Sequence, residues 1–125
     1  ENTARAMGAT VEVSIPWSMG YPVTYNDAGL ATFAVPVLES VAGAGRVVQV
    51  PPETGAEDFS FFAEKVPGFY FNLGGRPADV AEADATDHHT PDFYVDEGGL
   101  GLGVRAMTAL ALEYLRTHAA ARAEP

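Results

Sequence analysis

Cysteine is absent from the 125 residues of this chain, and basic residues are few. Without cysteine the chain forms no disulfide and offers no thiolate to a metal. Seven Lys and Arg stand against 17 Asp and Glu, which gives a formal net charge of -10. Binding to a phosphate backbone needs clustered positive charge, so we expect no nucleic-acid partner. Acidity of this kind favours solubility but does not identify a partner.

Long apolar runs are missing too. No stretch of roughly 18 apolar residues appears, and the N-terminus lacks a basic region followed by an apolar core. We therefore expect no membrane partner and a cytoplasmic location. The chain starts at "ENTARAMGATVEV" without Met, which is consistent with a fragment or a processed product.

What is present is ordinary globular material, with 47% hydrophobic and 19% charged residues, in a length sufficient for one domain with its own core. Short apolar or alternating segments predict strands at 11–15, 46–50 and 69–75. They alternate with amphipathic segments that predict helices, so the fold class is α/β.

Four helices are predicted. The first lies at 1–7 and ends at Gly8. The second follows Asn26 or Asp27 as N-cap and contains Pro36, which predicts a kink or a late start. A third covers about 56–65, and the last begins after Asp96. The buried face of the second should hold Leu30, Phe33, Ala34, Val37, Leu38 and Val41, and that of the last Val104, Met107, Ala111, Tyr114 and Leu115.

Acidic residues and glycines near helix starts have structural explanations. Thr54 and Glu57 fit a capping box, Asp58 suits the first turn of a helix, and Asp96 with Glu97 should cap the last helix. The glycines of "GGLGLG" at 98–103 do not have dinucleotide-loop spacing, and they favour close packing of a helix start against neighbouring backbone. The aromatic residues expected to pack in the core are Phe59, Phe61, Phe62, Phe69, Tyr70 and Phe71.

The segment "DHHTPDFYVDEGGL" at 87–100 holds two of the three histidines. Pro91 restricts the backbone around it, so His89 sits on a held loop, as a metal ligand requires. A solvated loop histidine has the same local sequence, and His88 is a second candidate ligand. The residues alone leave these alternatives open.

Two motifs resemble a known family. "GAEDFSFF" at 55–62, followed by "VPG" at 66–68, and "HTPDF" at 89–93, followed by "DEGGLGLG" at 96–103, are similar to segments of M20 metallo-amidohydrolases. The similarity is to the branch that hydrolyses hippurate, indoleacetyl-amino acids and other N-acyl amino acids. It covers nearly the whole chain but only the last third or so of a full-length member.

The resemblance implies that residues 1–20 end a lid and dimerisation domain. Residues 21–125 would then be the C-terminal part of an α/β, metallo-exopeptidase-like catalytic domain. His89 would be a metal ligand and Glu57 a substrate-binding residue, while His88 takes no family role. The parent enzyme would use one or two divalent ions, Zn or Mn, to cleave an N-acyl amino acid. The other ligands and the general-base Glu belong to the family's N-terminal portion, so we expect this chain alone to be inactive and to hold no metal.

A different class of function competes with this one. The half-fold could serve as a stand-alone, non-catalytic module for binding or self-association. Half of a sheet should leave an apolar edge and face uncovered, so we expect a homodimer or a larger assembly.

Overall fold

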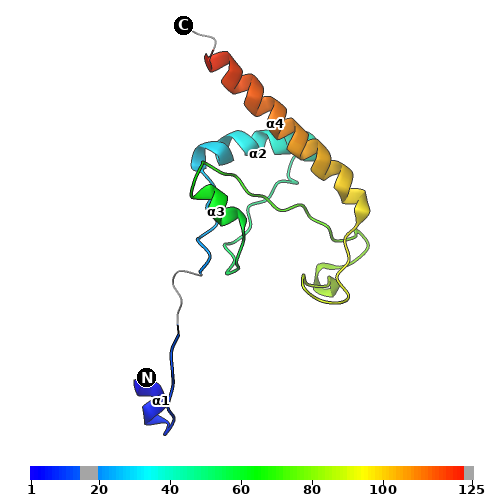
Figure 1. Ribbon diagram of the computed structural model, residues 1–125. Helices are drawn as coiled ribbons and strands as arrows, with labels where there is room; N and C mark the ends of the chain where they lie inside the picture. The colour runs from blue at the N-terminus through cyan, green and yellow to red at the C-terminus, as the bar shows by residue number, and fades with distance from the viewer. Residues whose placement is uncertain (15–19, 123–125) are drawn as a thin grey trace.

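The computed structural model describes residues 1–14 and 20–122 and consists of helices joined by extended segments (Figure 1). The α-helices are α1 (Asn2–Ala6), α2 (Ala28–Ala42), α3 (Phe59–Ala63) and α4 (Leu100–Arg122). Two 3-10 helices, η2 (Glu82–Asp84) and η3 (Glu97–Gly99), lie between α3 and α4. Among residues 1–14 and 20–122, no helix has the length and apolar content needed to cross a membrane.

Helix α2 begins as its sequence predicts. The carboxylate of Asp27 accepts a hydrogen bond from the Leu30 amide at 2.8 Å, which caps the first turn. The helix then runs through Pro36 without interruption, so the expected late start is wrong. The six residues of the predicted apolar face are all buried or half-buried, with Ala34 and Leu38 the most enclosed.

Helix α4 packs on α2, and this pair forms the core of the described residues (Figure 1). Ala106 is buried at the contact, and Phe33 of α2 meets Tyr114 of α4 edge-on with ring centroids 5.8 Å apart. The predicted inner stripe of α4 is wrong for four of its five residues, because Val104, Met107, Ala111 and Leu115 are exposed, whereas Tyr114 contacts Phe33 of α2. Helix α4 is apolar on two sides, and the side with the smaller residues faces α2. The more enclosed residues on that side are Leu102, Gly103, Ala106, Ala109 and Leu110.

The predicted strands form no β-ladder within residues 1–14 and 20–122, so the α/β class is not confirmed. Segments 11–14, 46–50 and 69–75 are instead irregular, and Ile15 lies outside the described residues. A strand exists only by hydrogen bonding to a neighbour, and these segments find none among the described residues. The alternation of polar and apolar residues therefore does not establish that these segments pair with a neighbouring strand.

The first and third helices match their predictions in part. Helix α1 ends before Gly8, whose φ of 72° is the left-handed conformation expected after a helix. Helix α3 is shorter than predicted and starts at Phe59. Three aromatic residues predicted to be core are exposed, namely Phe61, Phe62 and Tyr70, because α3 is covered by little else in this part of the chain.

Candidate functional site

The segment 68–75 crosses the molecule (Figure 1) and carries Tyr70, which contacts Glu57 of the candidate site. At its start, Asp27 donates its amide hydrogen to the Gly68 carbonyl at 2.9 Å. At its end, Asp96 donates its amide hydrogen to the Gly75 carbonyl at 2.7 Å. The segment thereby links the start of α2 to the turn that precedes α4, and it fixes the end of the histidine loop.

Asn26 holds the middle of this segment. Its Oδ1 accepts from the Tyr70 amide at 2.7 Å, and its Nδ2 donates to the Tyr70 carbonyl at 2.8 Å. Sequence analysis treated Asn26 only as a possible N-cap and missed this role. No local spacing reveals it, because the two residues are 44 positions apart.

Glu57 lies where Tyr70 can reach it. One carboxylate oxygen accepts from the Tyr70 hydroxyl at 3.2 Å, and the other accepts from the Phe59 amide at 3.1 Å. The predicted capping box is therefore wrong: Glu57 itself supplies the oxygen at the start of α3. Thr54, the predicted partner, is exposed and makes no side-chain hydrogen bond in the described structure.

Two tyrosine hydroxyls adjoin the carboxylates of Glu57 and Asp58. Partial burial, then the hydrogen bond to Glu57 and its charge, raise the pKa of Tyr70. The pKa of Tyr21 is raised chiefly by hydrogen bonding with the Asp58 carboxylate and by its charge, with smaller effects from burial and Glu57. A phenol is protonated at neutral pH even at its ordinary pKa of about 10, so both hydroxyls are hydrogen-bond donors there, and the raised pKa extends this range to higher pH.

His89 has a backbone conformation that its sequence did not predict. Its φ is 63°, in the left-handed region, and no other non-glycine residue in the described structure has a positive φ. Histidine is among the residue types enriched there, although the conformation still costs on the order of 1 kcal/mol. The next residues hold the loop: the Thr90 hydroxyl donates to the Asp87 carbonyl at 2.8 Å, and the Phe93 amide donates to the Thr90 carbonyl.

His88 and His89 are not equivalent. The ring of His88 packs edge-on against Phe93 with centroids 4.6 Å apart, whereas the two imidazoles are 6.4 Å from each other. His88 is thus a packing partner of Phe93 within the loop, whereas the His89 ring has only the more distant His88 ring as an aromatic neighbour among the described residues.

The residues present do not complete a metal site. No group of three or more His, Asp or Glu side chains capable of holding a metal occurs among the residues that the structure describes. A catalytic zinc needs about three protein ligands, so one imidazole does not suffice. The structure brings Glu57 together with Tyr70 and does not bring Glu57 to His89 as a joint ligand set.

At the start of α4 the packing prediction is confirmed, and the capping prediction is confirmed for Asp96 alone, which caps the 3-10 helix η3 directly before α4. The Asp96 carboxylate accepts from the Gly98 amide at 2.9 Å and caps η3. The glycines allow close packing: a Cβ at Gly99 would lie 3.4 Å from the Gly74 carbonyl oxygen, and one at Gly103 would lie 2.9 Å from a methyl of Leu73. The glycine-rich run therefore serves packing against 73–75, as predicted.

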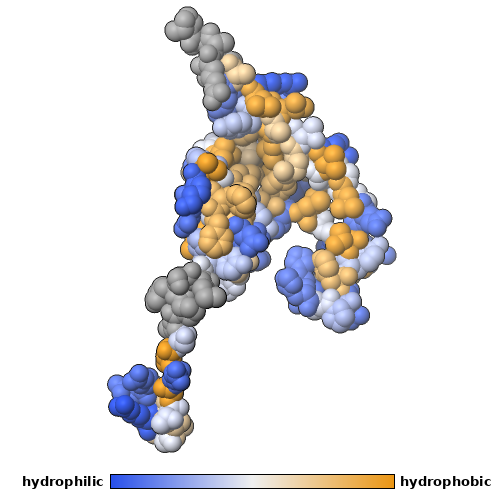
Figure 2. Space-filling view, viewed as in Figure 1, coloured by the Kyte–Doolittle hydropathy of each residue, from blue (hydrophilic) through white to orange (hydrophobic). Residues whose placement is uncertain are grey.

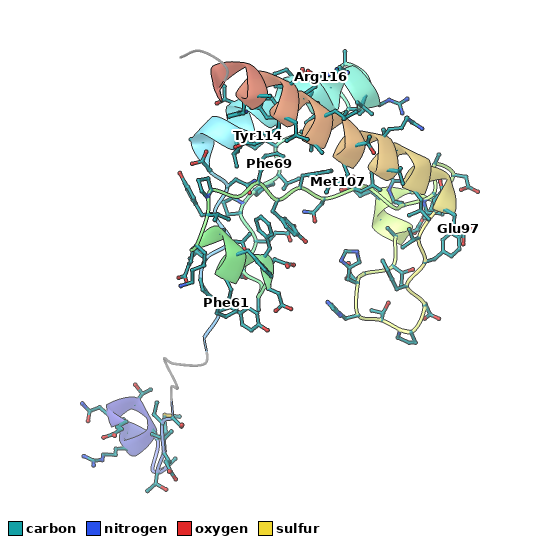
Figure 3. All side chains as sticks on the ribbon, turned by 45° about the horizontal axis from the view of Figure 1, so that its top comes forward. Phe61, Phe69, Glu97, Met107, Tyr114 and Arg116 are labelled. Carbon is teal, nitrogen blue, oxygen red and sulfur yellow. The ribbon has the colours of Figure 1, made fainter. Side chains whose placement is uncertain are left out.

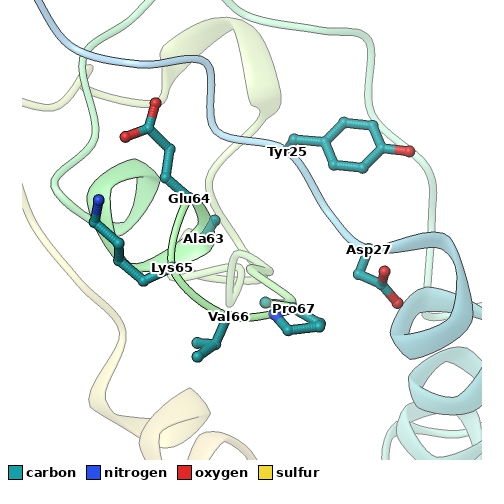
Figure 4. Close-up of a pocket in the computed structure, with 8 residues that line it drawn as sticks. Tyr25, Asp27, Ala63, Glu64, Lys65, Val66 and Pro67 are labelled. Atoms are coloured by element: carbon teal, nitrogen blue, oxygen red, sulfur yellow. The ribbon is translucent and has the colours of Figure 1, made fainter.

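A pocket of about 310 Å³ lies elsewhere, between the start of α2 and the end of α3 (Figure 4). Tyr25 and Asp27 form one side, and residues 63–68 form the other. Neither His89 nor Glu57 lines it. Since Asp27 is already engaged as the N-cap of α2, the pocket does not extend the candidate site.

The chain is similar to known proteins over most of its length. The family model described as "Peptidase family M20/M25/M40" matches residues 4–113, which include Glu57 and the His89 loop. Thermostable carboxypeptidase 2 of Saccharolobus solfataricus is 37% identical over 107 residues, covering 86% of this chain and 26% of that protein. IAA-amino acid hydrolase ILR1-like 4 of Arabidopsis thaliana is 32% identical over 95 residues, covering 76% of this chain and 21% of that protein.

A third relative, the putative amidohydrolase YhaA of Bacillus subtilis, is 25% identical over 107 residues, covering 86% of this chain and 26% of that protein. The chain thus spans about a quarter of the length of the curated relatives that it matches. No solved structure matches the chain.

Proposed function

The chain belongs to peptidase family M20/M25/M40, and we propose that it is the C-terminal part of a metal-dependent amidohydrolase that cleaves the amide bond of N-acyl amino acids. The relatives are named as carboxypeptidases, an amidohydrolase and amino acid hydrolases. These names share one reaction class, hydrolysis of an amide bond. We further propose that the substrates of the parent enzyme are hippurate-like.

The observation that carries the proposal is the conformation of His89 within the matched region. Its left-handed backbone is uncommon for a residue other than glycine, and the loop is tied at Asp87, Thr90 and Asp96. Strain of this kind is maintained where the surroundings hold it and is common at functional sites. We assign His89 as a ligand of a divalent metal, Zn or Mn, in the parent enzyme.

Glu57 is assigned to substrate binding. Both of its oxygens are held, by the Phe59 amide and the Tyr70 hydroxyl, so its orientation is fixed before a substrate arrives. A carboxylate with both oxygens held in this way is suited to positioning a substrate. The general base and the other metal ligands would come from polypeptide outside this chain. No catalytic step is assigned to the chain's own residues, and we propose that the chain alone is inactive.

The proposed domain boundaries follow the same scheme. Residues 1–20 would end the lid and dimerisation domain, and residues 21–125 would complete the catalytic domain. Helix α1 lies apart from α2 and α4 in Figure 1, in keeping with such a division.

The test joins this chain to the part of thermostable carboxypeptidase 2 that lies outside the match. The 125-residue chain with added Mn²⁺ or Zn²⁺ should not hydrolyse hippurate, while the joined protein should. His89→Ala in the joined protein should lower bound metal and abolish turnover, because a metal ligand is lost. His88→Ala is the matched control and should keep both. Full metal occupancy in the His89 variant would show that the ligand assignment is wrong, and turnover by the isolated chain would disprove the proposed inactivity.

A further inference from the structure

Helix α4 carries an apolar stripe on the side that faces away from α2. We name it the outer stripe; its members are three or four positions apart and all are exposed, Met107 by 61%. This spacing places them on one side of a helix. The outer stripe consists of Leu100, Val104, Met107, Ala111 and Leu115.

The exposure of the outer stripe is part of a larger deficit of burial. The accessible surface of this 13.2-kDa chain is 10662 Å². A folded monomer of that mass exposes about 6,400 Å² by the usual scaling of surface with mass. The excess is about 4,000 Å², part of it from the extended N-terminal segment. Figure 2 shows hydrophobic side chains at the surface over several parts of the molecule.

The exposed apolar residues are not confined to a helix. Val48 and Val50 in the unpaired segment 46–50 are also exposed, and their backbone groups have no ladder partner among the described residues. An occupant that covers both features needs strands for the segments and an apolar face for the stripe. An α/β body supplies both.

The size of the deficit argues against a second copy as that occupant. A standard protein–protein interface hides about 800 Å² on each partner, and a large obligate homodimer interface hides about 1,000–2,500 Å² on each, which is below the excess. Two copies would also bring together net charges of -10 each.

We propose that the outer stripe is the docking surface for the polypeptide that M20 relatives carry outside the matched quarter. This inference rests on the proposed function, since it takes the chain to be part of such an enzyme. It adds which surface of the chain meets the remainder and what kind of structure meets it. Figure 3 shows Met107 on α4 as the labelled residue of the stripe.

Oxidation of Met107 by hydrogen peroxide tests the proposal without using activity. In the 125-residue chain Met107 should react at nearly its rate in guanidinium chloride. In the chain joined to the remainder of thermostable carboxypeptidase 2, Met107 should be oxidised at least about tenfold more slowly, because docking buries it. Met107→Lys should lower the soluble yield of the joined protein. The matched control is Leu112→Lys, at a 48% exposed apolar position on another side of α4, which should not.

Each outcome separates the alternatives. If Met107 in the joined protein reacts as fast as in the isolated chain, the proposal is wrong even when hippurate is hydrolysed. Protection of Met107 without hydrolysis supports the docking surface and counts against the proposed function. If Met107 becomes protected in the isolated chain as its concentration rises, and sedimentation shows a dimer, a second copy is the occupant and the proposal is overturned.

Discussion

Asn26 and Tyr70 are joined by two hydrogen bonds in opposite directions, at 2.7 and 2.8 Å, across 44 residues of sequence. An asparagine side chain has one donor group and one acceptor, and here they pair with the backbone carbonyl and the backbone amide of the same residue, Tyr70. The pair attaches segment 68–75 beside the first turn of α2, where Asp27 adds a third bond to Gly68.

Asn26→Ala should release this segment. Each lost hydrogen bond costs about 1 kcal/mol, less where water replaces it, so amide exchange at Tyr70 should accelerate by roughly tenfold. Hydrogen–deuterium exchange measured by NMR reports this directly. Asn72→Ala is the control, because Asn72 is exposed on the same segment and makes no side-chain hydrogen bond in the described structure. Equal exchange in both variants would mean that the two bonds do not hold the segment in solution.

Ser60 and Thr54 should differ sharply when replaced by alanine. Ser60 is fully buried, and its hydroxyl donates to the Glu57 carbonyl at 2.6 Å. Ser60→Ala removes one of two hydrogen bonds to that carbonyl, which the Ser60 amide also reaches at 3.1 Å, and should cost about 1 kcal/mol. Thr54→Ala should cost less than about 0.5 kcal/mol, because an exposed residue without a cap bond contributes little. Urea unfolding of both variants decides the matter; a larger loss for Thr54→Ala would restore the capping box.

The sequence predicted those features that depend on neighbours along the chain. The face of α2, its N-cap at Asp27 and the cap at Asp96 were all predicted, because helical spacing and capping are local. The face of α4 failed because the helix is apolar on two sides, so spacing cannot choose between them. The partner of Asn26 lies 44 positions away, so no local pattern encodes it, and the left-handed conformation of His89 was not predicted from its neighbouring residues.

Strand prediction failed for a related reason. The apolar segment 46–50 has strand-like composition, but pairing is a long-range property. For the candidate site, the family motifs selected His89 and Glu57, whereas the roles of Tyr21 and Tyr70 became apparent only from the structure. Phenol donors beside carboxylates carry no sequence signature when they lie 13 or more positions apart, as Glu57 and Tyr70 do.

Glu57→Gln should lower the pKa of Tyr70 toward 10. Partial burial is the largest cause of the raised pKa and would persist, so the decrease should be partial. Because the folded-state pKa is above the unfolded value, the stability that Tyr70 contributes is complete below about pH 10. It is lost as the pH rises through the folded-state value. NMR titration of the ¹³C-labelled tyrosine ring carbon measures the pKa, with Glu53→Gln as the control. An unchanged pKa in Glu57→Gln would show that the carboxylate charge of Glu57 does not act on Tyr70.

Two glycines in the first turns of α4 should respond differently to alanine. In Gly101→Ala the new Cβ would meet only the end of the Arg105 side chain at 3.6 Å. Helix propensity then favours the variant by about 0.5–1 kcal/mol. In Gly103→Ala the Cβ would lie 2.9 Å from a Leu73 methyl, so that side chain must move. Leu73 is partly exposed and can move, so the expected result is a loss of most or all of the gain from helix propensity rather than unfolding.

Thermal unfolding should therefore give Gly101→Ala a higher melting temperature than the parent chain, and Gly103→Ala a lower one than Gly101→Ala. The double change Gly103→Ala with Leu73→Ala separates the two contributions, because removing the methyl should restore the gain from propensity at position 103. If Gly103→Ala stabilises the chain as much as Gly101→Ala does, then α4 does not pack against segment 73–75 in solution.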